Sequence, residues 1–166
     1  AYSSSNVVLI GKRNLQRTIY FSSNKGVTWD SLAMPFDCLE LHMSTPAKGF
    51  ARSITNELYF TNDSMQSWNK NLSIKIFRGC ITSGEKGILI TTTYETYTTS
   101  NSGESWNRIS DLNTNLINDI EVFDDNSAYA LTYSGELHFS WDFGSNWHLV
   151  KDSLPTPLRK LTRETD

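Results

Sequence analysis

The chain has 166 residues, 15 basic and 18 acidic, so its formal net charge is −3. This balance excludes the strongly basic surface typical of nucleic-acid-binding proteins, and no apolar run is long enough for a membrane-spanning helix. Aromatic residues make up 12% of the sequence, which favours a β protein because their side chains are enriched in strands. We expect one domain over residues 1–166.

The first predicted unit contains three strands. Residues 6–11 form a short apolar run, and residues 17–22 alternate so that Ile19 and Phe21 share one face. A third strand begins at Trp29, after the turn formed by residues 22–29. This unit is one strand shorter than each unit that follows.

The next three units each contain four short strands separated by turn signals. Their first three strands are predicted at 37–43, 49–54 and 58–61, at 76–82, 88–93 and 96–99, and at 117–123, 128–133 and 137–140. The fourth strands begin at Trp68, Trp106 and Trp147. Strands of this length and order fit the four-stranded blades of a propeller.

One turn occurs four times and reads hydroxyl-x-Asp/Asn-x-Gly-x-x-Trp, with Met65 as the exception. Its tryptophans are 39, 38 and 41 residues apart, which indicates a repeat architecture. Asp or Asn can bond backbone N–H groups within the turn, and glycine supplies positive φ. We therefore expect strain at Met65 and largely buried tryptophans. The residues assigned to this structural turn are Ser22, Asn24, Gly26, Trp29, Thr61, Asp63, Trp68, Thr99, Asn101, Gly103, Trp106, Ser140, Asp142, Gly144 and Trp147.

The pattern resembles the Asp-box, or BNR repeat, of β-propellers such as sialidases, sortilin-type receptors, xyloglucan-degrading glycosidases and a photosystem II assembly factor. The resemblance covers nearly the whole chain. It implies an all-β propeller of about four blades, each of four antiparallel strands. In that family the box joins the third and fourth strands of a blade at the periphery, and its role there is structural.

The C-terminal segment, residues 152–166, raises the question of ring closure. Residues 158–163 have strand length and follow the fourth unit where the innermost strand of a next blade would begin. The simplest expectation is that they complete the first blade, which would also hide open sheet edges. Members of the family usually have six or more blades, so three alternatives stay open. The chain is a fragment or half of a larger propeller, two chains self-associate to complete a ring, or the segment is only a tail.

No catalytic, metal or cofactor motif stands out. The predicted innermost strands carry four carboxylates that we expect to line a polar channel: Asp37, Glu40, Asp119 and Glu121. A glycosidase needs two carboxylates about 5–10 Å apart, and none of the arginines has the Arg-Ile-Pro context of the sialidase family. Cys38 and Cys80 are compatible with two buried thiols or with one disulfide.

A non-catalytic scaffold that binds a protein partner, secreted or extracytoplasmic, is the preferred functional hypothesis. In propellers the loops between blades usually share one face with the loops between each blade's second and third strands. That face would gather Arg13, Arg17, Arg52, Tyr94 and Tyr133, and Arg and Tyr are favoured at interface anchors. The alternative is a glycan-binding, lectin-like protein or part of a sialidase- or glycosidase-type propeller.

Overall fold

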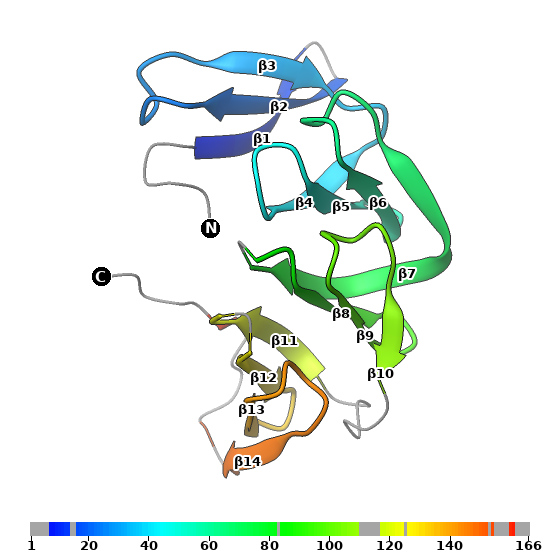
Figure 1. Cartoon of the computed structure of the whole chain (residues 1–166), viewed down its shortest axis with the longest axis vertical. Coiled ribbons are helices and arrows are strands. Elements are labelled where there is room, and N and C mark those ends of the chain that lie inside the picture. Colours follow the sequence, from blue (N-terminus) through cyan, green and yellow to red (C-terminus); the bar gives the residue numbers. More distant parts are fainter. Residues whose placement is uncertain are drawn as a thin grey trace.

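A computed structural model describes residues 7–13, 16–82, 84–109, 117–124, 126–152, 154 and 160–161. The described residues form β-strands and no helix, and all strand pairs are antiparallel (Figure 1). The described part of the chain has no helix long and apolar enough to cross a membrane. The expected all-β class is confirmed.

The strands form four blades in chain order. Blade 1 has three strands: β1 (Val7–Arg13), β2 (Gln16–Ser22) and β3 (Asp30–Ala33). Blade 2 has β4 (Cys38–Met43), β5 (Gly49–Ser53), β6 (Glu57–Thr61) and the first part of β7 (Asn69–Ile81). Blade 3 has the second part of β7, then β8 (Gly87–Thr91), β9 (Thr96–Thr99) and β10 (Asn107–Ile109). Blade 4 has β11 (Ile117–Val122), β12 (Ala128–Thr132), β13 (Leu137–Ser140) and β14 (His148–Lys151).

Strand β7 belongs to two blades, whereas the sequence predicts two separate strands. Asn69 and Lys70 pair with β6, and the part from Ile76 to Ile81 pairs with β8. No proline or glycine interrupts residues 69–76, so the backbone can stay extended from one blade into the next. Blades 2 and 3 therefore share one seven-stranded sheet.

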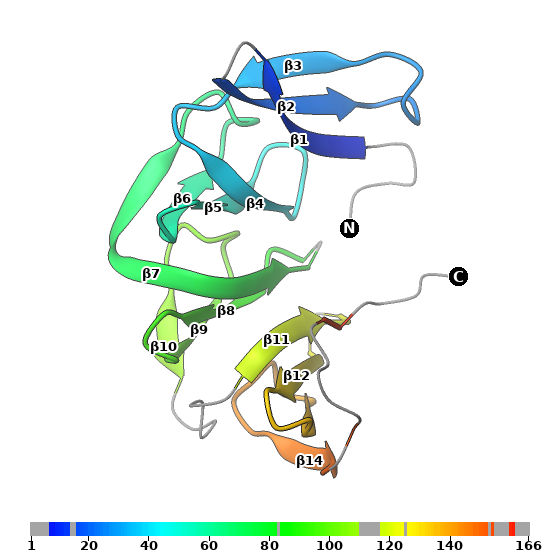
Figure 2. The ribbon, with the colours of Figure 1, turned by 180° about the vertical axis from the view of Figure 1, so that it is seen from behind.

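The blades follow one another around an open arc, with blade 1 at one end and blade 4 at the other (Figures 1 and 2). The expected closure of the ring is not found, because β1 pairs with β2 alone among the described strands. Most of the proposed closing segment lies outside the described residues. Its described residue Leu161 donates its backbone N–H to Asp119 of blade 4, at 2.6 Å. The open sheets fit the alternative of a fragment or partial propeller.

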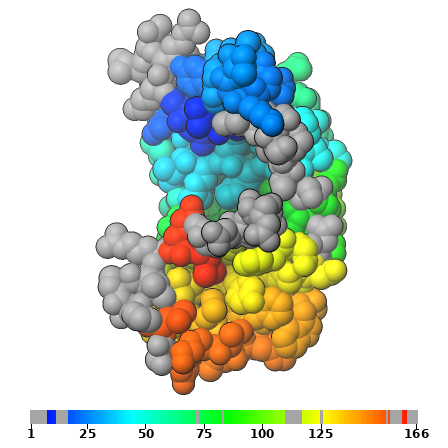
Figure 3. All heavy atoms as spheres, turned by 90° about the vertical axis from the view of Figure 1, so that its left-hand side faces the viewer, coloured from blue at the N-terminus to red at the C-terminus, as the bar shows by residue number. Residues whose placement is uncertain are grey.

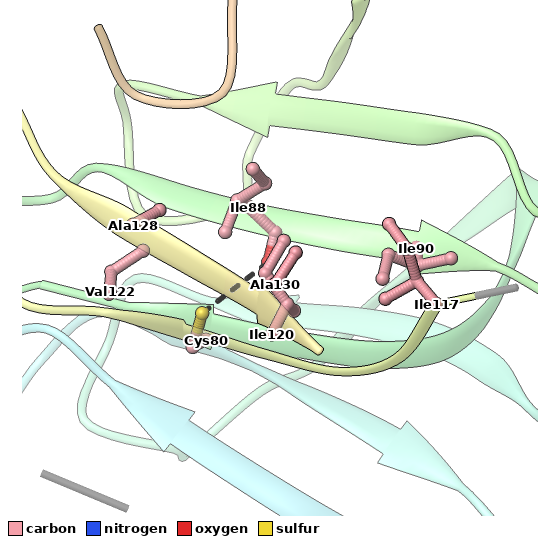
Figure 4. Close-up of a cluster of buried hydrophobic side chains, with 8 residues drawn as sticks. All are labelled: Cys80, Ile88, Ile90, Ile117, Ile120, Val122, Ala128 and Ala130. Carbon is pink, nitrogen blue, oxygen red and sulfur yellow. Dashed lines mark hydrogen bonds between the residues drawn. The ribbon is translucent and has the colours of Figure 1, made fainter. Parts of the chain in front are cut away.

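The apolar core is divided into three layers, one between each pair of neighbouring blades. Ile19, Ala51 and Met65 belong to the first layer, and Phe50 and Leu89 to the second. In the third layer, side chains of blade 3 such as Cys80 and Ile88 lie beside Ile120 and Ala130 of blade 4 (Figure 4). Each blade is thus stabilised by the apolar area that it buries against its neighbours.

Both cysteines are free and buried, so the disulfide alternative is wrong. Burial raises the pKa of Cys38 to about 12 and also raises the pKa of Cys80. Neither thiol is therefore poised as a thiolate nucleophile at neutral pH.

The repeated turn, called the box below, has the same geometry in all four copies. The first hydroxyl accepts the N–H of the fifth residue, at 2.8 Å for Gly26, 3.1 Å for Met65 and Gly103, and 2.7 Å for Gly144. The fifth residue always has positive φ, and Met65 has φ of 67°. The expected left-handed strain at Met65 is therefore present, since a side chain in this region costs about 1–2 kcal/mol.

The expectation that the four box tryptophans are largely buried is confirmed for Trp68, Trp106 and Trp147 and is wrong for Trp29. Trp29 is 41% exposed, while Trp68, Trp106 and Trp147 are half-buried. The latter three each pack in the core layer shared with the preceding blade. None of the described residues forms a blade that precedes blade 1, so Trp29 lacks this cover.

Candidate functional site

The innermost strands line a cavity of about 320 Å³ on the concave side of the arc. Strands β4, β7 and β11 supply most of its wall, which consists of Glu40, Leu41, His42, Arg78, Gly79, Asp119, Ile120, Glu121 and Lys160. Three of the four carboxylates expected at the channel line this cavity. The fourth, Asp37, instead pairs with Arg17, and its Oδ1 atom lies 3.4 Å from Arg17 Nε.

In each of β4, β7 and β11, a local irregularity of the strand directs one charged side chain toward the cavity. The pairing register shifts between Cys38 and Glu40 in β4, between Ile76 and Arg78 in β7, and between Ile117 and Asp119 in β11. Such shifts bend a strand and re-aim the next side chain. Glu40, Arg78 and Asp119 therefore occupy equivalent positions, with charges that alternate around the arc.

Arg78 joins the two carboxylates. Its Nη1 atom lies 3.1 Å from Glu40 Oε1, and its Nε atom lies 3.7 Å from Asp119 Oδ1. Arg52 Nη2 reaches Glu40 Oε1 at 3.2 Å, and Arg52 also donates to the carbonyl oxygen of Phe77. The Arg52 side chain is 7% exposed and that of Arg78 is 32% exposed. Arg52 is thus a buried residue that links neighbouring strands, while Arg78 is accessible from the cavity.

The environments of Glu40 and Asp119 shift their pKa values in opposite directions. Burial acts to raise the pKa of Glu40, but the His42 ring, whose Nε2 lies 3.9 Å from Glu40 Oε2, and the charges of Arg52 and Arg78 outweigh it and lower that pKa. Burial raises the pKa of Asp119, and the Leu161 N–H and the Arg78 charge only partly offset it. Glu40 is therefore the firmly ionised partner of Arg78, and Asp119 is the weaker one.

The structure does not gather the five predicted binding residues at this cavity. Arg52 is close to it but engaged internally, Arg17 pairs with Asp37, and the Arg13 side chain lies outside the described residues. Tyr94 and Tyr133 are 38% and 52% exposed and do not line the cavity. Their role in binding stays a prediction.

A second repeated turn, which the sequence analysis missed, joins the second and third strands in blades 2, 3 and 4. It reads Ser/Thr-x-Ser/Thr-x-Glu at residues 53–57, 91–95 and 132–136. In each copy the first hydroxyl accepts the glutamate N–H, at 3.0, 3.0 and 2.9 Å. The fourth residue has positive φ, as Asn56, Tyr94 and Gly135 show. Tyr94 and Tyr133 thus occupy different positions of the same turn.

Arg78 is the central residue that sequence reasoning did not select. The signal available was its spacing from Glu40 and Asp119, 38 and 41 residues, which matches the box period. No group of three metal-liganding side chains comes together in the part of the chain that the structure describes.

The antiparallel blades, the turns that join their third and fourth strands, and the innermost strands around a channel define a β-propeller in open form. Neither protein-family models nor curated proteins gave a match to the sequence. Solved propeller structures do resemble the chain. One is YCF48 bound to a D1 peptide, with a TM-score of 0.60, 19% identity and coverage of 73% of this chain.

Two further similar structures are YCF48 from Cyanidioschyzon merolae and a GH74 enzyme from Niastella koreensis. The former has a TM-score of 0.61 and 13% identity over 96% of this chain, and the latter 0.65 and 16% over 88%. The chain spans only 44% and 56% of the two YCF48 chains and 22% of the GH74 chain. At these identities the similarity shows the fold alone.

Proposed function

We propose that this chain is a non-catalytic scaffold that binds a protein partner, and that a carboxylate of the partner binds Arg78. The observation that carries the proposal is the accessible guanidinium of Arg78 at the cavity, shared by a firmly ionised Glu40 and a weaker Asp119. YCF48, which has the same fold, was solved with a D1 peptide bound, and this supports a polypeptide as the ligand.

Arg78 can accept a carboxylate without loss of its place in the structure. A guanidinium carries five N–H donors and binds carboxylates in a bidentate fork. The contact with Asp119 is long at 3.7 Å, so an incoming carboxylate can replace it while Glu40 at 3.1 Å keeps Arg78 oriented.

A glycoside hydrolase is the second candidate, and one observation favours it. Two carboxylates with pKa values shifted apart are typical of an acid and base pair, and the GH74 enzyme has the same fold. Against it, Arg78 contacts both Glu40 and Asp119 and so engages both carboxylates that would have to act on the glycosidic bond. We therefore prefer binding to catalysis.

The test is selection from a displayed library of random peptides, followed by affinity measurements with variants. We expect the selected peptides to be rich in acidic residues. Arg78→Ala should weaken their binding by about tenfold or more, which corresponds to ~1.4 kcal/mol, and the remaining affinity should depend less on salt. Arg108→Ala is the matched control, because Arg108 is an exposed arginine of blade 3 that pairs with Glu95.

Unchanged affinity of Arg78→Ala would show that the site is elsewhere. Hydrolysis of a glycan panel that Glu40→Gln abolishes would instead support the glycosidase candidate.

A further inference from the structure

The outer face of blade 4 has the side chains of a buried blade interface. Tyr129 and Phe139 are cross-strand partners on this face. By their pairing positions they correspond to Phe50 and Phe60 of blade 2, which pack in the core layer with blade 3. In blade 4 no described blade covers them. Tyr129 contacts Phe139, and Phe139 contacts Trp141, which is 58% exposed. Blade 4 therefore ends in a surface built to receive another blade.

The outer face of blade 1 has the complementary set. Leu9 and Tyr20 are cross-strand partners on this face, and they correspond to Leu89 and Tyr97 of blade 3. In blade 3 these positions pack against the preceding blade. In blade 1, Leu9 is 52% exposed, and the box residue Trp29 is exposed as well.

A size rule governs each contact between neighbouring blades. The fifth box residue meets the second residue of the second strand in the preceding blade. A Cβ on Gly103 would lie 3.1 Å from Cβ of Phe50, and one on Gly144 would lie 2.7 Å from Cδ1 of Ile88. Large partners thus require glycine. The exception, Met65, packs in the same layer as the smaller Val8, which explains why the second box can depart from glycine.

Under this rule Tyr129 of blade 4 requires a box with glycine, and the box of blade 1 carries Gly26 with φ of 86°. The three atoms nearest to a Cβ on Gly26 all belong to its own box residue Trp29, and no described blade packs on this side of blade 1. The two end faces therefore match each other in size as the internal interfaces do.

We propose that the outer face of blade 4 binds the outer face of blade 1 of a second copy of this chain, so that two copies close one ring. The two faces lie at opposite ends of an open arc in one chain (Figures 1 and 2), which favours a second copy over self-closure. The interface continues the blade packing already present three times within the chain. Contact between two different patches closes into a ring when the rotation fits.

The segment at residues 160–161 contacts the innermost strand of blade 4. It lies on the open side of the arc beside blade 4 (Figure 3), where Leu161 bonds Asp119 and Lys160 lines the cavity. Lys160 follows Asp119 by 41 residues and continues the alternation of Glu40, Arg78 and Asp119. β1 has no described partner on its inner edge, so this edge of blade 1 is open to the second copy.

The first test is the mass of the chain by sedimentation equilibrium. We expect two chains for the unsubstituted protein and one chain for either Leu9→Arg or Tyr129→Arg, because each buries a charge at the interface. Ile54→Arg is the matched control, since Ile54 is 51% exposed on a turn of the internal blade 2, and it should remain dimeric. Circular dichroism checks that each variant is folded.

The second test is disulfide trapping between separately labelled chains with Gly26→Cys and Tyr129→Cys. The corresponding internal pair would have its Cβ atoms 3.1 Å apart, so a small outward shift brings the pair to the separation of about 3.5–4.5 Å found in disulfides. We expect a covalent product that contains one chain of each kind. A monomeric unsubstituted chain, a dimer that survives both arginine substitutions, or a bond within one chain when both cysteines are present would each overturn the proposal.

Discussion

Replacement of Gly144 by alanine tests whether the neighbouring blade, and not only the conformation of the box, excludes a side chain at this position. The residue has φ of 87°, and a side chain in this region costs about 1–2 kcal/mol. The new Cβ would lie 2.7 Å from Cδ1 of Ile88 and 3.1 Å from Cδ1 of Ile109. Overpacking of this kind costs typically about 1–3 kcal/mol. We expect Gly144→Ala to lower the free energy of unfolding by roughly 2–5 kcal/mol.

The matched control is Gly26→Ala, at the same box position with φ of 86°. There the nearest atom to a new Cβ is Cζ2 of Trp29 at 3.3 Å, within the same box. We expect only the backbone cost of about 1–2 kcal/mol. Urea unfolding followed by circular dichroism, at concentrations where the chain is monomeric, gives both values. Equal losses in the two variants would refute the role of the neighbouring blade.

Two further predictions concern charged groups. Arg52→Ala should lower the free energy of unfolding by roughly 3 kcal/mol, because it breaks a buried ion pair with Glu40. In the same urea assay Arg108→Ala should change it by less than about 1 kcal/mol, because its pair with Glu95 is exposed. Hydrogen bonds from Lys70, Lys75 and Tyr59 lower the pKa of Glu57 from 4.5 to about 2, so its stabilisation is present above pH 4.5 and lost as pH falls toward 2. The difference in melting temperature between the parent chain and Glu57→Gln should therefore shrink over that range, and a constant difference would contradict the assignment.

The repeat and the order of strands could be read from the sequence because they depend on local chemistry. The hydroxyl, the Asp or Asn and the glycine of each box interact within eight residues, so their pattern is visible along the chain. The same locality made it possible to predict positive φ at Met65. The second hydroxyl turn at residues 53–57, 91–95 and 132–136 is equally local and was available to the same reasoning.

The burial of the box tryptophans could not be predicted in this way. Trp29 and Trp106 occupy the same place in their boxes and both donate to the glycine carbonyl, at 2.9 and 3.1 Å. Trp106 packs edge-on against Phe50 of the preceding blade, whereas Trp29 has no described blade on that side. The difference comes from a neighbour in space and not from the box.

The sequence by itself determined four units, their short strands and the turns that separate them, because each turn is stabilised by bonds among neighbouring residues. The tertiary structure alone decided the site. Glu40, Arg78 and Asp119 are about 40 residues apart in sequence and meet only because three strand irregularities aim them at one cavity. It also gave Arg52, one of the predicted binding residues, an internal partner in Glu40, since the partners of a long side chain depend on which strands lie beside it.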